Sequence, residues 1–413
     1  MTVEEMAYNA RKAGRILGAM PGKARGAAIL AMAKMLEERR ADVMAANAAD
    51  VQQAEADGLS GPLLERLKVS DKVFTYMQKR LNEAALLPDP LGITSRGHVR
   101  PSGLKVRRVS VPLGVIGIIY ESRPNVTTDA AAVCIKSGNA VILRGGSEAI
   151  RTNTLLAEIM QNAAVSCGVP ADAVQIIGTT DRSAVGELLQ QEKYVDVIIP
   201  RGGKSLIERI SRESRIPVIK HYEGICHQYV AADADAEMAV SVVVNSKCQK
   251  VEVCNALETL LIDAECAGRI LPSLAEALRE RGVELRGDEQ SRAIAPMEKA
   301  AREDWAAEYL APILSIRIVR GVDEAIDHIN TWGSGHTDGI ITGSLATSNR
   351  FIAGVDSASV LVNASTRLSG GGDYGMGAVV GISTDKLHAR GPVGPEELTS
   401  YKWVAVGDGH LRG

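Results

Sequence analysis

Aromatic side chains are scarce in this sequence. Among 413 residues there are 2 Phe, 9 Tyr and 3 Trp, which together make 3% of the chain. Because 46% of the residues are hydrophobic, the chain still has enough apolar side chains for a folded core, and Ala, Val, Ile and Leu must build it. The length is sufficient for two or three domains.

Long apolar runs, excess positive charge and paired cysteines are lacking as well. No stretch approaches the roughly 20 uninterrupted apolar residues of a membrane span, and we expect neither a signal peptide nor a membrane partner. The net charge is −3 without a long basic run, which argues against nucleic acid as a partner. Six cysteines without paired spacing do not form a disulfide framework, so we expect a reducing, cytoplasmic setting.

Helical spacing of apolar residues dominates the first 90 residues, and alternating β and α patterns follow from Leu113 onward. A second series of strands and helices begins after Glu223. Strands separated by helices of this length predict an α/β fold, a parallel sheet with helices on both faces. Between the helical and alternating parts, residues 92–112 alternate charged residues with valine, which predicts an exposed hairpin. In the first series the expected strands are 115–119, 140–143, 174–177 and 195–199.

Cys254 is the candidate nucleophile. It precedes the apolar run 257–262 and follows a polar stretch that contains Lys247 and Lys250. Nearby cations lower the pKa of a thiol, and the thiolate is the form that attacks. Cys248 competes for the role because its neighbours are more polar still, and a buried core cysteine is the ordinary alternative for either residue.

Two other chemistries use the same residue types. A Cys–His hydrolase would take His227 or His336 as its base, and the spacing neither supports nor excludes it. A metal centre is a weaker interpretation, because the cysteines 226, 248 and 254 form no C-x-x-C pair and the histidines form no pair at ligand spacing. We therefore predict no metal site.

Two turns after expected strands combine glycines with a cation and a hydroxyl. Each turn is expected to lead into a helix, whose first N–H groups favour an anion. A serine that merely caps the helix is the alternative for either turn alone, but two such turns in one sheet predict a phosphate-bearing cofactor. Neither turn is a G-x-G-x-x-G fingerprint or a P-loop. The residues concerned are Arg144, Gly145, Gly146, Ser147 and Glu148 in the first turn, and Arg201, Gly202, Gly203, Lys204 and Ser205 in the second.

Asn125 follows the first expected strand, directly after Pro124. Its amide can donate a hydrogen bond to a developing oxyanion, and such a donor is worth roughly 3–4 kcal/mol. An Asx turn or a helix cap is an equally simple explanation of an asparagine at this place.

Several segments together resemble the gamma-glutamyl phosphate reductases, also called glutamate-5-semialdehyde dehydrogenases, of the aldehyde dehydrogenase superfamily. The resemblance covers essentially the whole chain, and the segment near the C-terminus is the most specific part. The matching segments are 111–127, 136–149, 253–260, 335–338, 363–367 and 381–394.

The resemblance implies the second step of proline biosynthesis from glutamate. L-glutamyl 5-phosphate would be reduced by NADPH to L-glutamate 5-semialdehyde with release of phosphate. Cys254 falls on the nucleophile of the family, Asn125 on the oxyanion asparagine, and Glu308 near the ribose-binding glutamate of the superfamily. The turns 144–148 and 201–205 fall on the cofactor-binding loops.

The resemblance also implies a domain organisation. Residues 1–91 and 112–222 would form the cofactor-binding domain, residues 223–393 the catalytic domain, and residues 92–111 and 394–413 an oligomerisation element. A homo-oligomer, dimer or tetramer, is therefore expected. Because acyl phosphates are labile, a glutamate kinase is a further expected partner.

Within this scheme, Ser365, Thr366 and Arg367 are expected to hold a substrate carboxylate, which suits a fork of donors. Arg144 and the cations near Ser205 predict a preference for NADPH. Two other functions stay open: an aldehyde oxidiser that uses Glu223 as base, and a nucleotide sensor without catalysis. The chain departs from the family pattern at residues 250–252, 368–370 and Val379, which lie in loops expected at the substrate end.

Overall fold

The computed structural model describes residues 1–412, and the chain folds into two compact units. Unit 1 comprises residues 1–220, 375–382 and 386–413, and unit 2 comprises residues 221–374 and 383–385. No helix among the described residues is long and apolar enough to cross a membrane. Each unit has its own parallel sheet, so the two are described one after the other.

Unit 1 is built on a four-stranded parallel sheet in the order β5-β4-β3-β6. Every residue of the central strand β3 is buried, which explains its uninterrupted apolar sequence. β6 lies at the edge, where Pro200 is tolerated because an edge strand can dispense with one N–H. The strands are β3 (Val115–Tyr120), β4 (Ala140–Arg144), β5 (Val174–Ile176) and β6 (Val197–Arg201).

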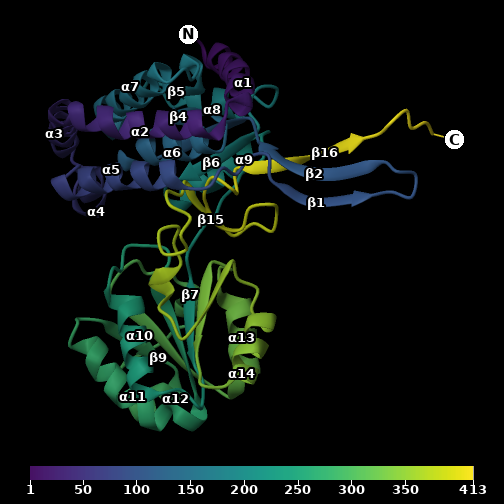
Figure 1. Ribbon diagram of the computed structural model, residues 1–413. Coiled ribbons are helices and arrows are strands. Elements are labelled where there is room, and N and C mark those ends of the chain that lie inside the picture. Colours follow the sequence, from purple (N-terminus) through teal and green to yellow (C-terminus); the bar gives the residue numbers. More distant parts are fainter. Residues whose placement is uncertain (413) are drawn as a thin grey trace. The chain divides into compact units, whose positions relative to one another are not determined.

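Helices cover both faces of this sheet (Figure 1). Alternate residues of β3 face opposite sides: Ile116 and Ile118 join one hydrophobic cluster, and Val115 and Ile119 join the other. One face is packed by α2 (Gly22–Glu38), α5 (Asp71–Leu86), α6 (Asn125–Lys136) and α7 (Ile150–Ser166). The other is packed by α1 (Val3–Ala19), α8 (Ser183–Leu189) and α9 (Lys204–Glu213). Two further helices, α3 (Arg40–Ala56) and α4 (Gly61–Leu67), complete the N-terminal part.

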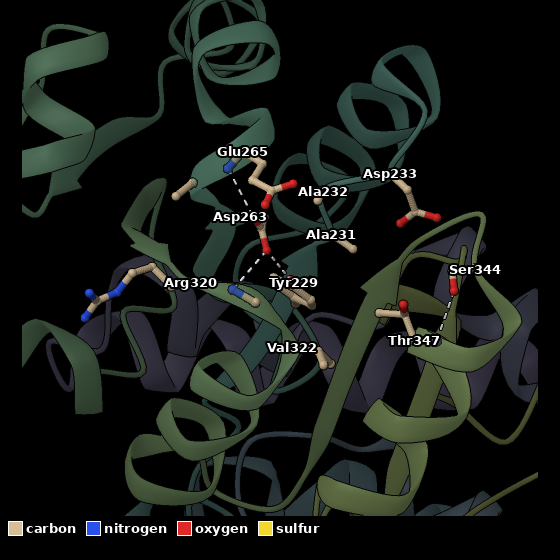
Figure 2. A pocket seen from close by; sticks show the side chains of 12 residues that line it. Tyr229, Ala231, Ala232, Asp233, Asp263, Glu265, Arg320, Val322, Ser344 and Thr347 are labelled. Carbon is tan, nitrogen blue, oxygen red and sulfur yellow. Dashed lines mark hydrogen bonds between the residues drawn. The ribbon is translucent and has the colours of Figure 1, made fainter.

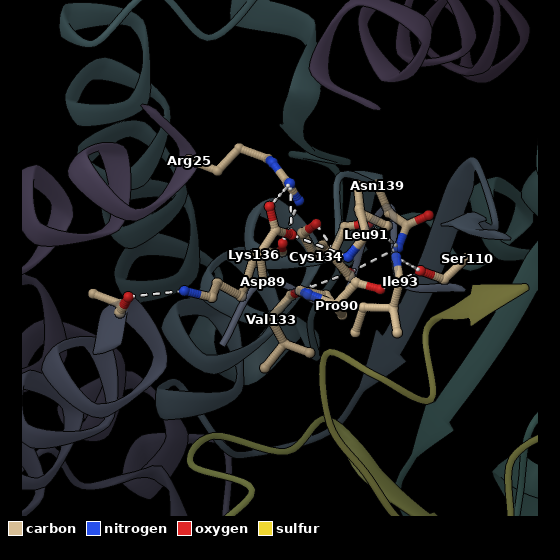
Figure 3. A network of polar contacts seen from close by, with 12 residues as sticks. Arg25, Asp89, Pro90, Leu91, Ile93, Ser110, Val133, Cys134, Lys136 and Asn139 are labelled. Atoms are coloured by element: carbon tan, nitrogen blue, oxygen red, sulfur yellow. Dashed lines mark hydrogen bonds and ion pairs between the residues drawn. The ribbon is translucent and has the colours of Figure 1, made fainter. Parts of the chain in front are cut away.

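A polar network fastens the N-terminal helices to the sheet layer (Figure 3). The Arg25 guanidinium, 2% exposed, binds both carboxylate oxygens of Asp89 at 2.8 and 2.9 Å and donates to the Lys136 carbonyl. Lys136 Nζ donates in turn to the Ala85 carbonyl at 2.8 Å. One nitrogen of Arg25 contacts both oxygens of Asp89 while the other binds the Lys136 carbonyl, so the linker after α5 is tied to α6.

A three-stranded antiparallel sheet projects from unit 1 in the order β1-β2-β16 (Figure 1). The strands are β1 (Thr94–Val99), β2 (Lys105–Pro112) and β16 (Thr399–Val406). The hairpin expected at residues 92–112 is thus confirmed, and the C-terminal strand pairs with it from Thr399 opposite Pro112 to Val406 opposite Lys105. All residues of β1 are exposed, so this outer strand presents a free edge.

Unit 2 contains a seven-stranded sheet in the order β10-β9-β11-β8-β7-β12-β13, with every pair parallel. Helices again pack on both faces, one group against each hydrophobic cluster. The strands are β7 (Cys226–Val230), β8 (Leu257–Asp263), β9 (Glu284–Gly287), β10 (Glu298–Lys299), β11 (Ile313–Val319), β12 (Thr337–Ile341) and β13 (Ser359–Val362). The helices are α10 (Ala236–Cys248), α11 (Ala264–Arg279), α12 (Glu289–Ile294), α13 (Gly321–Trp332) and α14 (Leu345–Gly354).

The predicted division into domains stays a prediction, and the two units differ from it at the C-terminus. Residues 375–382 and 386–393 belong to unit 1, not with residues 223–374, because buried residues such as Val380 and Val393 pack into the core of unit 1. The two short strands of this segment, β14 (Gly381–Ser383) and β15 (Gly391–Val393), pair with each other. The antiparallel sheet also clusters with unit 1 and does not separate from it.

Candidate active site

Cys254 lies half-buried in the turn that leads into β8. Its carbonyl oxygen accepts the thiol proton of Cys226, with the sulfur 3.2 Å away. Gly224 runs against the same peptide: a Cβ at residue 224 would lie 1.8 Å from the Cys254 carbonyl oxygen. Only glycine fits there, and Cys254 is therefore held by backbone contact as well as by the strand behind it.

Glu308 supports this arrangement from the loop before β11. Its carboxylate accepts the Gly224 N–H at 2.8 Å, so the residue that resembles a ribose-binding glutamate also positions the backbone beside Cys254. Glu223 is the neighbour of Gly224 and is half-buried. The cofactor role of Glu308 and the basic role of Glu223 stay predictions.

The segment with the expected substrate residues lies beside the Cys254 turn. Asn255 Nδ2 donates to the carbonyls of Arg367 and Ser369, at 3.3 and 2.9 Å. Arg367 Nε donates to Gln249 Oε1 at 2.9 Å, and its positive charge interacts with Cys254 and Asp373. Burial lowers the pKa of Arg367, and the negative charge of Cys254 opposes this effect.

Ser365 and Thr366 are placed differently from Arg367. Both are buried, and they anchor their segment to the end of α10, where Ser246 Oγ accepts the Thr366 N–H at 3.2 Å and lies 3.1 Å from Ser365 Oγ. The Ser365 hydroxyl also caps the short 3₁₀ turn at Thr366–Leu368. Of the three expected substrate residues, Arg367 is the one whose charge reaches Cys254, and all three roles stay predictions.

The cations expected to activate Cys254 are not available in the way the sequence suggests. α10 extends to Cys248, which buries Lys247 completely, and Lys247 Nζ binds Glu258 Oε2 at 2.6 Å. Burial raises the pKa of Glu258 and lowers that of Lys247, and the contact between the two opposes both effects. Lys250 is exposed in the loop that follows. Arg367 is thus a cation that acts on the thiol, and Lys247 is a structural partner of Glu258.

Cys248 is a poor competitor for the role of nucleophile. It is the last residue of α10 and packs against the hydrophobic cluster on that face of the sheet. Burial raises its pKa, which keeps it a thiol. The environment therefore favours Cys254 over Cys248, as the resemblance implies.

Two histidines lie close to Cys254. Ligand atoms of His221, Cys254 and His336 are all within 4.8 Å of one another, and the two rings meet edge to face with centroids 5.4 Å apart. His336 was considered as a base from the sequence, whereas His221 was missed. The other candidate base, His227, is fully buried and binds Asp338 Oδ1 through its ring nitrogen at 3.1 Å.

The topology explains why these three residues meet. Each lies just before a strand: His221 before β7, Cys254 before β8 and His336 before β12. Because β8, β7 and β12 are neighbours in a parallel sheet, their amino ends lie along one edge. Residues 222–225 separate His221 from β7, so no pattern at the start of a strand marks it in the sequence.

The expected cofactor residues of unit 1 lie at the carboxyl ends of its strands. Arg144 is the last residue of β4 and Arg201 the last residue of β6, on either side of β3. Two strand spacings separate their backbones by about 10 Å. Among the described residues, Nε of each arginine is buried without a hydrogen-bond partner, which suits a bound anion. Arg144 Nη1 donates to the Gly145 carbonyl, and burial lowers the pKa of its guanidinium.

The serines of the two turns do not cap the helices that follow these strands. α7 begins at Ile150 after a 3₁₀ turn at Ser147–Ala149, and α9 begins at Lys204, so neither Ser147 nor Ser205 is the cap residue. Glu148 Oε1 accepts the N–H and the hydroxyl of Ser122, at 2.7 and 2.6 Å. Glu121 Oε2 accepts the Gly203 N–H at 2.8 Å. The Gly203 N–H at the start of α9, which was expected to face an anion of the cofactor, is therefore already bound to the Glu121 carboxylate.

The segment Gly202–Ser205 remains exposed at this edge, so it is accessible to a ligand. Side chains of the chain itself crowd Gly145 and Gly146. A Cβ at Gly145 would lie 2.1 Å from Asn153 Nδ2, and one at Gly146 would lie 2.0 Å from Glu148 Oε1. The cofactor roles of both turns stay predictions.

Asn125 is the first residue of α6. Its Nδ2 donates one hydrogen bond to Asp129 Oδ2 at 3.2 Å, which leaves the second amide proton for another acceptor. Burial raises the pKa of Asp129 to about 6, and Arg80 and Asn125 oppose this rise. The oxyanion role of Asn125 stays a prediction.

A cavity of about 580 Å³ lies at the opposite edge of the sheet of unit 2, beyond the carboxyl ends of β7 and β8 (Figure 2). Its polar groups serve the fold. Asp263 accepts the Tyr229 hydroxyl at 2.7 Å and the N–H groups of Glu265 and Gly321 at 3.0 and 3.1 Å, which caps α11. The candidate nucleophile lies at the other edge, so this cavity is not the candidate active site.

Known proteins resemble this chain over its whole length. The model of the aldehyde dehydrogenase family matches residues 1–310. The gamma-glutamyl phosphate reductase of Thermotoga maritima is 41% identical over 100% of both chains, with a TM-score of 0.96. The enzyme of the same name from Saccharomyces cerevisiae is 30% identical over 100% of this chain and 99% of its own, with a TM-score of 0.56.

A more distant structure supports the fold alone. An acetylating aldehyde dehydrogenase from Geobacillus thermoglucosidasius is 19% identical over 100% of this chain and 97% of its own, with a TM-score of 0.71. The α/β, aldehyde dehydrogenase-like fold expected from the sequence is thus confirmed. The chain belongs to the aldehyde dehydrogenase family and, within it, to the gamma-glutamyl phosphate reductases.

Proposed function

We propose that this protein reduces L-glutamyl 5-phosphate to L-glutamate 5-semialdehyde and releases phosphate, the second step of proline biosynthesis. The observation that carries the proposal is the full-length similarity to two gamma-glutamyl phosphate reductases, at 41% and 30% identity. Membership of the family implies a nicotinamide cofactor, and we propose that it is NADPH.

Cys254 is the proposed nucleophile. Its thiolate attacks the acyl carbon, the bond to the phosphate oxygen breaks, and a thioester forms on the sulfur. After reduction, the thiohemiacetal oxyanion collapses and expels the thiolate, which frees the aldehyde and restores the enzyme. The charge of Arg367, which interacts with Cys254, favours the thiolate.

The backbone around Cys254 supports this chemistry because it is fixed before substrate binds. Gly224 contacts the Cys254 peptide, and Asn255 ties the turn to the carbonyls of Arg367 and Ser369. A nucleophile that is held in place pays less entropy in the reaction. Asn125 is proposed to donate its second amide proton to the oxyanion of the thiohemiacetal.

The residues of unit 1 fit a dinucleotide with a phosphate. Arg144 and Arg201 end the two strands that flank β3, at the carboxyl edge of a parallel sheet, the usual place for such a ligand. The buried Nε atoms of both arginines have no hydrogen-bond partner among the described residues, and each can donate a hydrogen bond to a phosphate oxygen. When bound, the reduced nicotinamide supplies the hydride for the thioester.

The direction of the reaction distinguishes this proposal from the aldehyde oxidiser. An oxidiser needs a base that activates water at the thioester, for which Glu223 is the candidate. In the proposed reductase, water at the thioester would destroy the intermediate, so Glu223 is not required as a base. The full-length similarity to two reductases favours reduction.

The decisive experiment follows the reverse reaction, the phosphate- and NADP⁺-dependent oxidation of glutamate semialdehyde. We expect Cys254→Ala to lose at least about 10³-fold in kcat, since removal of a catalytic nucleophile can cost about 10⁶-fold. The matched control, Cys248→Ala, removes the other thiol of this region and is expected to keep its activity. Oxidation of simple aldehydes or ester hydrolysis without any phosphate-dependent reaction would contradict the proposal, and so would full activity of Cys254→Ala.

We further propose that the protein forms a homo-oligomer through the sheet β1-β2-β16, whose outer strand has a free edge. Light scattering tests this: removal of residues 399–413 should yield monomers, and an unchanged mass would contradict it.

A glutamate kinase is a second proposed partner, testable by transfer of the labile acyl phosphate without release to solvent. A cytoplasmic location is proposed because the described part of the chain contains no disulfide.

A further inference from the structure

Three side chains with atoms suited to zinc surround the candidate nucleophile. His221, Cys254 and His336 each offer one ligand atom, and these atoms lie within 4.8 Å of one another. We propose that this cluster binds a soft divalent cation, Zn²⁺ or its spectroscopic substitute Co²⁺, and that the bound ion silences the enzyme by holding the sulfur of Cys254.

The chemistry of the three ligands selects the class of metal. Zinc takes thiolate sulfur and imidazole nitrogen, most often in a tetrahedral arrangement, whereas magnesium and calcium prefer oxygen ligands. A tetrahedral zinc ion would bring its ligand atoms to roughly 3.5 Å from one another. The cluster therefore has to contract by roughly 1 Å, which small side-chain rotations can supply.

Hydrogen bonds orient His336 for this role. Its Nδ1 lies 2.8 Å from Thr337 Oγ1, and the Thr337 hydroxyl donates its proton to Ser369 Oγ at 2.8 Å. Thr337 Oγ1 must then accept from the ring, so Nδ1 is the donor in this bond and Nε2 is the nitrogen that can bind a metal. A metal-binding histidine is commonly fixed by such a bond from its other nitrogen.

The remaining two ligands complete a site with three protein atoms. His221 is half-buried in the loop before β7, and its ring meets the His336 ring edge to face, with an interplanar angle of 65°. The nearby thiol of Cys226 donates its proton to the Cys254 carbonyl oxygen. Three protein ligands leave the fourth position to water or phosphate, the pattern of a zinc site that is open to solutes.

Metal binding itself follows from this geometry, whereas inhibition rests on the proposed function. A sulfur that is coordinated to zinc has its attacking electron pair engaged and cannot form the thioester. We therefore expect activity to fall in proportion to the occupied sites and to return when a chelator removes the ion.

The test uses the full-length, metal-free protein with a reductant that contains no thiol. Titration with Co²⁺ should produce a thiolate-to-cobalt absorption band in the near ultraviolet that saturates at one ion per chain. Calorimetry with Zn²⁺ should give the same stoichiometry. Without a band, or with binding that Cys254→Ser leaves unchanged, the metal site is overturned.

Matched variants separate the cluster from other histidines and thiols. His221→Gln is expected to weaken zinc binding by more than about 100-fold, because loss of a second-shell contact alone costs roughly 10–100-fold. Thr337→Val tests the orientation of His336 and should weaken binding within that smaller range. His98→Gln on the exposed strand β1 and Cys248→Ser are controls that should bind zinc like the wild type. A His221→Gln variant that binds zinc as tightly as the wild type would overturn the site.

Two combined outcomes separate this inference from the proposed function. A saturating cobalt band with undiminished activity would support the metal site and would count against Cys254 as nucleophile. Loss of activity in Cys254→Ser without any cobalt band in the wild type would overturn the metal site and leave the proposed function standing.

Discussion

In unit 1 the candidate cofactor residues lie at the carboxyl ends of parallel strands, whereas in unit 2 Cys254 and its neighbours lie at the amino ends. Carboxyl ends lead into helix starts, whose N–H groups and positive end attract anions. Amino ends follow helix C-termini, where free carbonyls and the negative end of the helix disfavour a thiolate. The same kind of sheet thus offers two electrically different edges.

Side-chain contacts stabilise the amino edge of unit 2, where the helix C-termini give no favourable electrostatic contribution. Lys247 and Glu258 form a fully buried ion pair at the end of α10, and Asn255 binds the carbonyls of Arg367 and Ser369. The carboxyl edge of unit 2, by contrast, carries the cavity of Figure 2, where Asp263 caps a helix. The general rule for α/β sheets would therefore place a ligand site of unit 2 at the edge with this cavity, and not at the edge where the candidate nucleophile lies.

The largest expected effect comes from breaking the buried ion pair of unit 2. Lys247→Met leaves the carboxylate of Glu258 buried without its cation, and we expect a loss of about 3–5 kcal/mol in the free energy of unfolding. Urea denaturation at neutral pH measures it. Replacement of both residues, Lys247→Met with Glu258→Leu, should recover most of the loss because no charge stays buried.

The matched pair in unit 1 is Arg209–Glu213 on α9, the helix that follows β6. Both side chains are more than a third exposed, so Arg209→Met is expected to change the free energy of unfolding by less than about 1 kcal/mol. If Lys247→Met lowered the free energy of unfolding no more than Arg209→Met does, the ion pair Lys247–Glu258 would not be what stabilises the amino edge of unit 2.

In unit 1, removal of a buried charge, that of Asp129, should raise the free energy of unfolding, whereas Lys247→Met in unit 2 lowers it. Asp129 on α6 is 8% exposed, and burial raises its pKa to about 6 from an ordinary 3.8. Between these two pH values the folded state binds more protons than the unfolded state, so stability is highest below the lower value and falls as pH rises through 6. Asp129→Asn should therefore stabilise the protein at pH 7 by up to about 3 kcal/mol and remove this dependence.

Denaturation curves between pH 4 and 8 measure this effect. The control is Asp181→Asn in the same unit: Asp181 is exposed, and hydrogen bonds from Ser183 lower its pKa, so its loss should not stabilise the protein at pH 7. An Asp129→Asn protein that is less stable than the wild type at pH 7 would contradict the expectation.

The sequence predicts most of the framework of both sheets. β3 and β4 are found within one residue of the expected positions, because strands buried on both faces are near-continuous apolar runs. β8 begins at Leu257, where the run after Cys254 was expected, although Glu258 and Thr259 interrupt its apolar residues. β6 begins two residues later than expected and includes Arg201, which becomes a strand residue instead of a loop residue. The short strands β9 and β10 were missed, since runs of two to four residues carry no periodic signal.

The candidate sites are predicted less completely than the strands. Local residue types make Cys254 and the two arginine turns candidates, but they leave Cys248 as a competitor, and only the family resemblance separates the two cysteines. His221 was missed because the cluster depends on strand order, which brings the starts of β7, β8 and β12 together. The sequence presents Lys247 as a cation near Cys254, because it does not show that Glu258 will meet this lysine in the core. Site residues that strand order brings together from distant parts of the sequence cannot be predicted from their spacing, and a structure is needed to find them.

The third prediction compares close backbone contact at the two edges. Gly224→Ala would place a Cβ 1.8 Å from the Cys254 carbonyl oxygen, so the backbone must move. We expect a loss of about 1–3 kcal/mol in stability and a fall in kcat, since the nucleophile moves with its peptide. At the edge of unit 1, a Cβ at Gly202 would meet the flexible ends of Glu121 and Leu206, which can turn away.

Gly202→Ala is therefore expected to cost less stability than Gly224→Ala. Gly186→Ala is the control without a close contact: no atom lies within 4 Å of its Cβ position in α8, and alanine in a helix should raise the free energy of unfolding by roughly 0.5–1 kcal/mol. Thermal and urea denaturation rank the three variants. Equal losses at residues 224 and 202 would mean that the two edges are equally rigid.

The smallest expected effect concerns the anion preference of the carboxyl edge. Arg144→Gln removes a buried cation whose Nε lacks a partner among the described residues, so the KM for NADPH should rise about tenfold while the KM for NADH stays the same. The control Arg151→Gln removes an arginine of α7 that binds Asp50, and it should change neither KM. Equal changes for both cofactors would assign Arg144 to a phosphate that NADH and NADPH share. No change for either would leave Arg201 as the cation that the ligand meets, and would place the anion at the exposed segment Gly202–Ser205 beside it.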